Sequence, residues 1–277
     1  MSTRTDNWDV SITPEEAGWD FSGIRVLSLA AGESTTFSTE DCEYLFVPFE
    51  GAFTVTVDGQ LIALSGRPSV FSGGTDVMYA PKGSSVRIES ADGGRICLPF
   101  ARARQRHPLQ YLAKAAIPTQ LRGAGSMTRK IFDFGGVDVL QADRLIACEV
   151  ITPGGNWSSY PPHKHDETTE HESKLEEIYY FEVADGPNGP GFAYQRVSDS
   201  DDRPADLLEE VRSGDVVLVP HGWHGPAMAP PGYDLYYLNV MAGPAAERAW
   251  RITDEPSTAW VRESWVGLAP DPRLTTG

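Results

Sequence analysis

Short segments rich in β-branched and aromatic residues recur along the chain, separated by glycine and proline. The 277 residues include 27 glycines and 21 prolines. β-Branched and aromatic side chains favour strands, whereas glycine and proline favour turns. The predicted strand regions are IRVLSLAAG (24–32), EYLFVPF (43–49), AFTVTVDGQLIAL (52–64), SVRIES (85–90), DRLIACEVITPGG (143–155), GFAYQRV (191–197), DVVLVP (215–220) and YDLYYLNVMAG (233–243). So many short strands at close spacing predict an all-β sandwich or barrel.

Helical signals are sparse by comparison. The best helix candidates are PLQYLAKA (108–115) and PADLLEEVRS (204–213). The predicted fold is therefore all-β with few helices.

The two halves of the chain resemble each other. TDVMYAPKGSSV (75–86) aligns with GDVVLVPHGWHG (214–225), since each has Asp-Val, a proline five residues after the aspartate, and then a glycine. CEYLFVPFEG (42–51) aligns in the same way with EEIYYFEVADG (176–186). A repeat of this kind indicates a duplicated structural unit. Each half is predicted to form one copy of the same small barrel.

This repeat divides the chain into four predicted parts. They are an N-terminal lead (1–21), an N-terminal barrel (22–105), a connector (106–130), and a C-terminal barrel with a C-terminal tail (131–277). The region from residue 101 to 130 is unusually basic, with Arg102, Arg104, Arg106, Arg122, Arg129 and Lys130. Two interpretations are open: this region holds a partner subunit of a homo-oligomer, or it is a solvated linker that pairs with the acidic surface.

Net charge excludes two classes of partner. The formal charge of −16 argues against binding nucleic acid or an anionic membrane surface, because both need a basic face. No apolar stretch approaches the 18 or so residues of a membrane span, and the N-terminus lacks the apolar core of a signal peptide. The three cysteines are widely spaced and form no Cys-x-x-Cys motif, as expected in a reducing compartment. We therefore expect a cytoplasmic protein.

The motif PPHKHD (161–166) places His163 and His165 one residue apart. In an extended segment, residues i and i+2 point to the same face, so both imidazoles can reach one point. In LEEIYYFEV (175–183), Glu177 is a third candidate ligand, on the same strand face as Tyr179. The alternative is that the histidines are surface residues of a charged loop. We favour a metal site.

His224 is the fourth candidate ligand, because it follows the turn at Pro220 and Gly222 in the second copy of the repeat. The alternative is a packed turn histidine. The first copy has Ser85 at the aligned position and no His-x-His near Glu43, so it is predicted to lack a metal. Three histidines and a glutamate suit a divalent ion, with Zn²⁺ and Mn²⁺ placed ahead of Fe²⁺ and Ni²⁺.

These motifs resemble those of the cupins, and two copies would make a bicupin of two tandem double-stranded β-helix barrels. More specifically, PPHKHD, LEEIYYF, GFAYQRV, VVLVPHGWH and GYDLYYLNVMAGP (232–244) are similar to the 5-deoxy-glucuronate isomerases of bacterial myo-inositol catabolism. The resemblance implies an aldose–ketose isomerase that converts 5-deoxy-D-glucuronate, a small sugar acid, to 2-deoxy-5-keto-D-gluconate. It also implies His163, His165, Glu177 and His224 as metal ligands. The chain departs from the family pattern at His221, at Trp223 and in DEPSTAW (254–260), which leaves the exact sugar acid open.

Such an isomerase must remove a proton from C2 and deliver one to C1, beside a metal that acts as Lewis acid. Tyr179 and Tyr237 are the catalytic candidates, and Tyr236, Glu172 and Lys174 are alternatives. For substrate binding we propose Arg196, since guanidinium pairs bidentately with carboxylate, together with Lys174. The alternative for each tyrosine is core packing, and for Arg196 a structural ion pair. Two other functions remain open: a metal dioxygenase, and a sugar-binding module without catalysis.

Overall fold

Strands dominate the computed structural model, which describes residues 3–4, 8–200 and 203–275. The all-β prediction is confirmed. The described residues contain one α-helix, α1 (Pro14–Ala17), which begins at a capping box of Thr13 and Glu16. The short 3₁₀ helices are η1 (Val70–Ser72), η2 (Lys114–Ala116), η3 (Gly125–Met127), η4 (Ala259–Trp265) and η5 (Pro272–Leu274).

The structure divides into two compact units. Unit 1 comprises Met1–Pro118, Phe134–Ala147 and Val240–Ala242. Unit 2 comprises Thr119–Asp133, Cys148–Asn239 and Gly243–Gly277.

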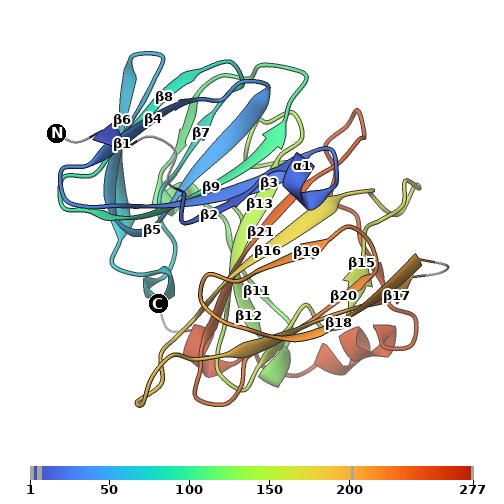
Figure 1. The fold of residues 1–277 in the computed structure, drawn as a ribbon. Coiled ribbons are helices and arrows are strands. Elements are labelled where there is room, and N and C mark those ends of the chain that lie inside the picture. The colour runs from blue at the N-terminus through green and yellow to red at the C-terminus, as the bar shows by residue number, and fades with distance from the viewer. Residues whose placement is uncertain (1–2, 5–7, 201–202, 276–277) are drawn as a thin grey trace. The chain divides into compact units, whose positions relative to one another are not determined.

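Unit 1 is built on a ten-stranded sheet (Figure 1). Its long central strand, β5, pairs with β6, β7, β8 and β9, and its hydrophobic core includes Phe46, Val55 and Leu98. The strands of this sheet are β1 (Thr3–Arg4), β2 (Val10–Ile12), β3 (Ser22–Leu29), β4 (Ser34–Ser38), β5 (Cys42–Val57), β6 (Gln60–Arg67), β7 (Val77–Ala80), β8 (Ser85–Glu89), β9 (Gly94–Arg102) and β10 (Gln110–Leu112).

Glu43 is fully buried in unit 1, where it binds hydrogen-bond donors of the protein itself. Its Oε1 accepts from the backbone N–H groups of Arg144 and Leu145 at 2.7 and 2.8 Å. Its Oε2 accepts from the backbone N–H of Asp143 at 2.8 Å and from the Tyr79 hydroxyl at 2.7 Å. The residue that aligns with Glu177 in the sequence repeat therefore anchors the segment that precedes β13.

We expect Glu43→Gln to destabilise the protein by about 3 kcal/mol, because the amide NH₂ faces backbone donors and leaves them without an acceptor. Urea unfolding measures this change in free energy. Glu50→Gln, at an exposed position on the same strand, is the matched control and should change the stability by less than about 0.5 kcal/mol. Equal stabilities of the two variants would contradict the anchoring role.

Two six-stranded sheets contain the later strands. The first runs in the order β11 (Thr119–Arg122), β12 (Arg129–Phe132), β13 (Ile146–Thr152), β21 (Leu235–Ala242), β16 (Glu176–Val183) and β19 (Val216–Val219). The second comprises β18 (Arg203–Val211), β17 (Ala193–Ser200), β20 (Trp223–Met228), β15 (His163–Lys164), β22 (Thr253–Asp254) and β14 (Trp157–Ser158). Both contribute to the core of unit 2, with Phe181 from the first sheet and Val197 from the second.

Both predicted helices are wrong. Residues 204–213 lie mostly in β18, which pairs with β17 so that Leu207 is opposite Val197. Residues 108–115 form β10 and the start of η2. In both places cross-strand pairing overrides the helix propensity of the local sequence.

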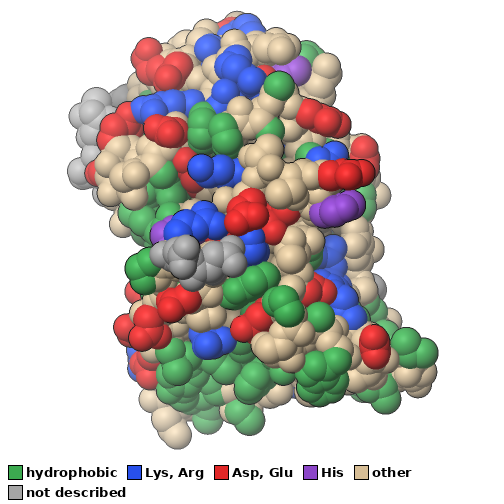
Figure 2. All heavy atoms as spheres, turned by 90° about the vertical axis from the view of Figure 1, so that its right-hand side faces the viewer, with side chains coloured by type: hydrophobic (Ala, Val, Ile, Leu, Met, Phe, Trp, Pro, Cys, Tyr) green, Lys and Arg blue, Asp and Glu red, His purple; other side chains and the backbone are tan. Residues whose placement is uncertain are grey.

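Charged side chains of both signs are interspersed over the face shown in Figure 2. Within the described ranges, no helix has the length and apolar character that spanning a membrane requires.

Candidate metal centre and active site

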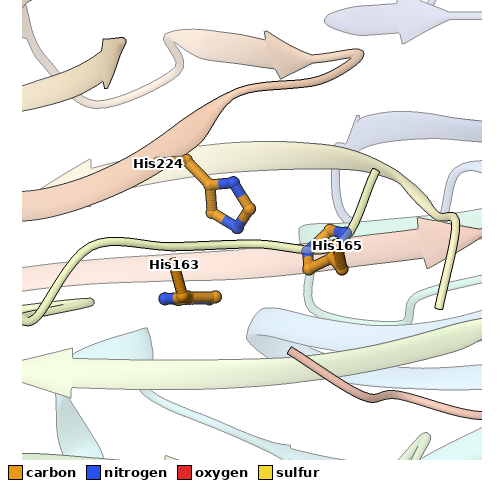
Figure 3. Close-up of side chains that lie close together, drawn as sticks. All are labelled: His163, His165 and His224. Carbon is orange, nitrogen blue, oxygen red and sulfur yellow. The ribbon is translucent and has the colours of Figure 1, made fainter. Parts of the chain in front are cut away.

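Three histidines converge in unit 2 (Figure 3). His163 on β15 is directly opposite His224 on β20 in an antiparallel pair, and His165 follows β15 on the same side. The ring centroids of His163 and His165 lie 4.5 and 4.6 Å from that of His224. One ring nitrogen from each histidine lies within 4.8 Å of the others. The strand pairing thus brings together residues about 60 positions apart in the sequence.

Glu177 on β16 completes this cluster. Its Oε2 lies 3.0 Å from Nε2 of His165 and 2.9 Å from Nε2 of His224. Asn239 on β21 donates from Nδ2 to the other oxygen, Oε1, at 2.6 Å and so fixes the carboxylate orientation. Burial alone would raise the pKa of Glu177, but His224 and His165 outweigh it and hold that pKa below its usual range. The carboxylate is therefore ionised.

The outer nitrogens of two histidines are held by backbone carbonyls. Nδ1 of His165 donates to the Leu175 carbonyl at 3.3 Å, and Nδ1 of His224 donates to the Gly222 carbonyl at 3.0 Å. In the neutral imidazole, this arrangement leaves the lone pair of Nε2 directed at the cluster. Burial and the neighbouring His224 lower the pKa of His163 well below its usual value, which favours the neutral form that binds metal.

The cluster fits a divalent metal ion. Nε2 of His224 is buried, and it lacks a well-directed hydrogen bond in the described structure although Glu177 is 2.9 Å away. A nitrogen in that position is costly unless a ligand occupies it. Neutral imidazoles and one carboxylate are the donor set that such ions prefer, and here backbone carbonyls orient two of the imidazoles while Asn239 orients the carboxylate.

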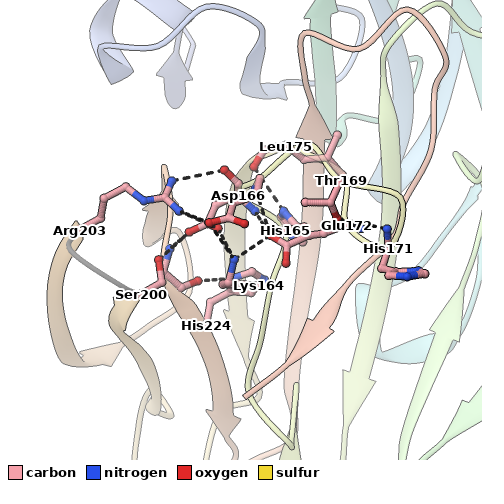
Figure 4. Close-up of polar contacts among 12 residues, drawn as sticks. Lys164, His165, Asp166, Thr169, His171, Glu172, Leu175, Ser200, Arg203 and His224 are labelled. Atoms are coloured by element: carbon pink, nitrogen blue, oxygen red, sulfur yellow. Dashed lines mark hydrogen bonds and ion pairs between the residues drawn. The ribbon is translucent and has the colours of Figure 1, made fainter. Parts of the chain in front are cut away.

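A buried ion cluster lies next to the histidines (Figure 4). Nζ of Lys164 donates to Asp166 at 2.9 Å and to Glu172 at 3.0 Å, and all three side chains are buried. Oδ2 of Asp166 also accepts from the Ser200 hydroxyl at 2.7 Å and from the backbone N–H of Gly222 at 2.9 Å. Asp166 therefore fixes the turn whose carbonyl orients His224.

Gly222 occupies a position that only glycine fits. Its φ is +103°, and a Cβ there would lie 2.6 Å from the Ser198 carbonyl oxygen. The backbone can therefore pass close to β17 before β20 begins, and His224 enters the cluster from this turn.

Asp166→Asn is expected to weaken zinc binding about 10- to 100-fold, the usual effect of losing a group that orients a metal ligand. The amide cannot accept all the donors that converge on Asp166, so the Gly222 turn and His224 lose their fixed position. Zinc affinity is measured by competition with a chromogenic chelator, and circular dichroism checks the fold. Glu170→Gln, in the exposed part of the same loop, should bind zinc like the wild type. Unchanged affinity in a folded Asp166→Asn protein would refute this role.

A small cavity of about 30 Å³ lies against the cluster, with His163 and Glu177 in its wall. Tyr179 and Tyr237 also line it, and Oγ of Ser159 lies 3.5 and 3.3 Å from their hydroxyl oxygens. Burial raises the pKa of both tyrosines, so both hydroxyls keep their protons in the ordinary pH range. The remaining lining residues are Arg122, Arg129, Ile131, Cys148, Val150, Asn239 and Trp250.

A larger cavity of about 420 Å³ shares two wall residues, Arg122 and Trp250, with the small one. Its other wall residues are Ile252, Asp254 and Arg262. A volume of this size is typical of small-molecule sites, whereas the inner cavity holds little more than a water molecule. The larger cavity is thus the candidate substrate chamber.

The structure places only some of the predicted catalytic and substrate-binding residues in the cavity walls. Tyr179 and Tyr237 line the inner cavity, but Tyr236 points away and donates to Glu149 at 2.8 Å. Glu172 belongs to the buried ion cluster, as its bond to Lys164 shows.

Lys174 and Arg196 are absent from the walls of both cavities. Lys174 is exposed. On β17, buried Gln195 and Val197 alternate with the half-buried Arg196, so the guanidinium lies on the opposite face of the strand.

Several wall residues that can donate hydrogen bonds were not predicted as site residues, among them Arg122, Arg129, Ser159, Asn239 and Trp250. The two arginines belong to the basic region that was assigned to a connector, where residues 119–122 and 129–132 instead form paired strands. Excess positive charge in an acidic chain was the available signal. Asn239 carried no comparable signal, because its role depends on which strand lies beside β16.

The fold and the site define a cupin-like, β-rich protein with a candidate metal centre. The model of the KduI/IolB family matches residues 1–261. The chain belongs to this family, and the resemblance noted in the sequence is confirmed.

Relatives named 5-deoxy-glucuronate isomerase match most of the chain. The protein from Geobacillus kaustophilus is 38% identical over 258 residues, which cover 92% of this chain and 91% of that protein. The protein from Lacticaseibacillus casei is 36% identical over 244 residues, covering 87% of this chain and 88% of that protein.

Solved structures agree with the fold. An IolB-like protein from Salmonella typhimurium LT2 superposes with a TM-score of 0.85 and 33% identity, covering 94% of this chain and 98% of that one. The oxalate decarboxylase of Lactobacillus farciminis gives a TM-score of 0.62 at 14% identity, covering 88% of this chain and 82% of that one. The second likeness concerns the fold alone.

Proposed function

We propose that this protein is a metal-dependent aldose–ketose isomerase that converts 5-deoxy-D-glucuronate to 2-deoxy-5-keto-D-gluconate. The observation that carries the proposal is the buried cluster of three histidines and Glu177 beside two tyrosine hydroxyls. Membership of the KduI/IolB family and the shared name of the relatives support the same reaction.

His163, His165, Glu177 and His224 would hold the ion, with zinc or manganese as the proposed metal. When bound, a divalent ion supplies Lewis-acid polarisation of the sugar carbonyl. Asn239 keeps the Glu177 carboxylate facing the histidines. The backbone carbonyls of Leu175 and Gly222 keep two imidazoles in the binding orientation.

Tyr179 and Tyr237 serve the proton transfer between the two substrate oxygens. Isomerisation moves one hydrogen from C2 to C1 and one from the C2 hydroxyl to the C1 oxygen, and the oxidation state of the whole molecule does not change. Tyr179 and Tyr237 present O–H groups to the cavity, and Ser159 lies between them. This Tyr–Ser–Tyr chain can donate a proton to one substrate oxygen and receive one from another. The buried walls limit the access of water to the reacting carbons.

We also propose that the chain is a bicupin of two tandem double-stranded β-helix barrels. The internal repeat supports this architecture. The first barrel is the predicted 22–105 region. The second is the predicted 131–277 region, and the pairing of β11 and β12 in sequence with β13 supports adding residues from Thr119 onward to it.

The test is an assay of the purified, metal-loaded protein on 5-deoxy-D-glucuronate, with NMR detection of the ketose. We expect complete conversion to the equilibrium mixture, and no ketose from an otherwise identical reaction with the chelated protein. Absence of the ketose with each of zinc, manganese, iron and nickel would overturn the proposal.

A further inference from the structure

Arg129 and Arg122 line the inner cavity together with His163 and Glu177, and among the described residues neither forms an ion pair with a carboxylate. Arg129 lies on β12 and is only 5% exposed. Its guanidinium donates to the Met127 carbonyl at 3.3 Å and lies 5.8 Å from the Trp265 ring centroid. Burial lowers the pKa of Arg129 to about 10, so it is still charged at neutral pH. A buried cation without a counter-charge is destabilising unless a ligand supplies one.

The second arginine adds to this excess of positive charge. Arg122 on β11 is directly opposite Arg129 in the antiparallel register. Like charges at directly opposed positions repel and destabilise a sheet. The fold nevertheless places both at the cavity, which is the arrangement expected where an anion binds between them.

The remaining polar groups offer no internal anion for this pair. The Glu177 carboxylate is engaged by His165, His224 and Asn239. In the larger cavity, Asp254 is paired with Arg262 at 2.6 Å.

Trp250 lines both cavities, and its buried indole N–H lacks an acceptor among the residues that the structure describes. This wall therefore presents hydrogen-bond donors in excess of acceptors. A ligand rich in acceptors, such as a carboxylate or a sugar acid, fits it best.

We propose that Arg129 and Arg122 bind the carboxylate of the sugar acid, with the Trp250 N–H as a further donor to the substrate. The inference rests on the proposed function for the identity of the substrate, but the subsite is testable by binding alone. The aldehyde end of the sugar then faces the histidines while the carboxylate end meets the planar guanidinium forks, which match its geometry. The arginine pair selects sugar acids over neutral sugars.

Isothermal titration of the zinc-loaded protein with D-glucuronate and with its uncharged amide, D-glucuronamide, tests this subsite. We expect the wild type to bind the acid more tightly than the amide. Arg129→Gln should lose about 10- to 100-fold in affinity for the acid, as expected when hydrogen bonds to a charged group are removed, and little for the amide. Arg129→Lys retains the charge without the fork and should keep part of the preference.

Arg122→Gln is the second test, because Arg122 is only partly buried and its removal leaves the core unchanged. Arg212→Gln, at an exposed arginine that follows β18 and lines neither cavity, is the matched control and should bind both ligands like the wild type. Zinc content and circular dichroism are checked in every variant. The proposal is overturned if folded, zinc-loaded Arg129→Gln and Arg122→Gln both retain the wild-type preference; if Arg129→Gln does not fold, Arg122→Gln decides.

The binding test is independent of the isomerase assay. If the protein does not isomerise 5-deoxy-D-glucuronate but its preference for the acid depends on Arg129, the proposed function fails and the subsite stands. If the protein isomerises the substrate and the variants keep the preference, the subsite fails and the function stands.

Discussion

The His163→Ala/His165→Ala double variant is expected to bind no metal, whereas the wild type binds one ion per chain. The two substitutions remove two of the three converging imidazoles, and one histidine with one carboxylate does not hold a divalent ion firmly. Within the described residues, a single group of this composition was found. In the first repeat, Glu43 is occupied by backbone N–H groups and the Tyr79 hydroxyl.

Elemental analysis of dialysed protein measures the stoichiometry. Turnover of the double variant should fall by about 10³-fold or more, because several kcal/mol of Lewis-acid stabilisation disappear. His171→Ala removes an exposed histidine of the same loop and should leave both metal and turnover unchanged. Two ions per wild-type chain, or full occupancy in the double variant, would contradict the assignment.

Removal of the metal should abolish turnover while the fold survives. The core of unit 2 contains Tyr179, Phe181, Val197 and Leu235, which pack together without the help of an ion. A domain with such a core keeps its structure when the metal leaves, unlike a small zinc domain that unfolds.

The far-ultraviolet circular dichroism of the chelated protein should therefore match that of the loaded protein, and readdition of zinc or manganese should restore activity. Loss of the β-sheet signal on chelation would instead show that the ion is structural.

The convergence of His163, His165 and His224 followed from sequence because local rules govern it. An extended His-x-His segment places two rings on one face, and a Pro-x-Gly turn fixes where the next strand begins. The structure adds the cross-strand pair of His163 with His224. The structure also adds that Tyr237 on β21 lines the inner cavity, whereas its neighbour Tyr236 donates to Glu149.

Other features depend on long-range pairing that one sequence does not specify. Arg122 and Arg129 become neighbours only through the register of β11 with β12. The segment 204–213 has helix-forming leucines and glutamates, yet most of it forms strand β18, which pairs with β17. Arg196 was predicted to bind substrate because guanidinium pairs with carboxylate. In the structure it alternates with buried residues of β17 and does not line the inner cavity.

Conversion of 5-deoxy-D-glucuronate in D₂O, with and without O₂, tests the central claim most directly. An isomerase that passes the C2 hydrogen through a protein group exchanges it with solvent, and it needs no oxidant. We predict equal conversion under both atmospheres, with deuterium at the new CH₂OH carbon detected by NMR. Retention of hydrogen with full anaerobic turnover would contradict passage of the C2 hydrogen through a protein group, and would leave Tyr179 and Tyr237 only the transfer between the two oxygens. A strict requirement for O₂ would contradict the isomerase itself.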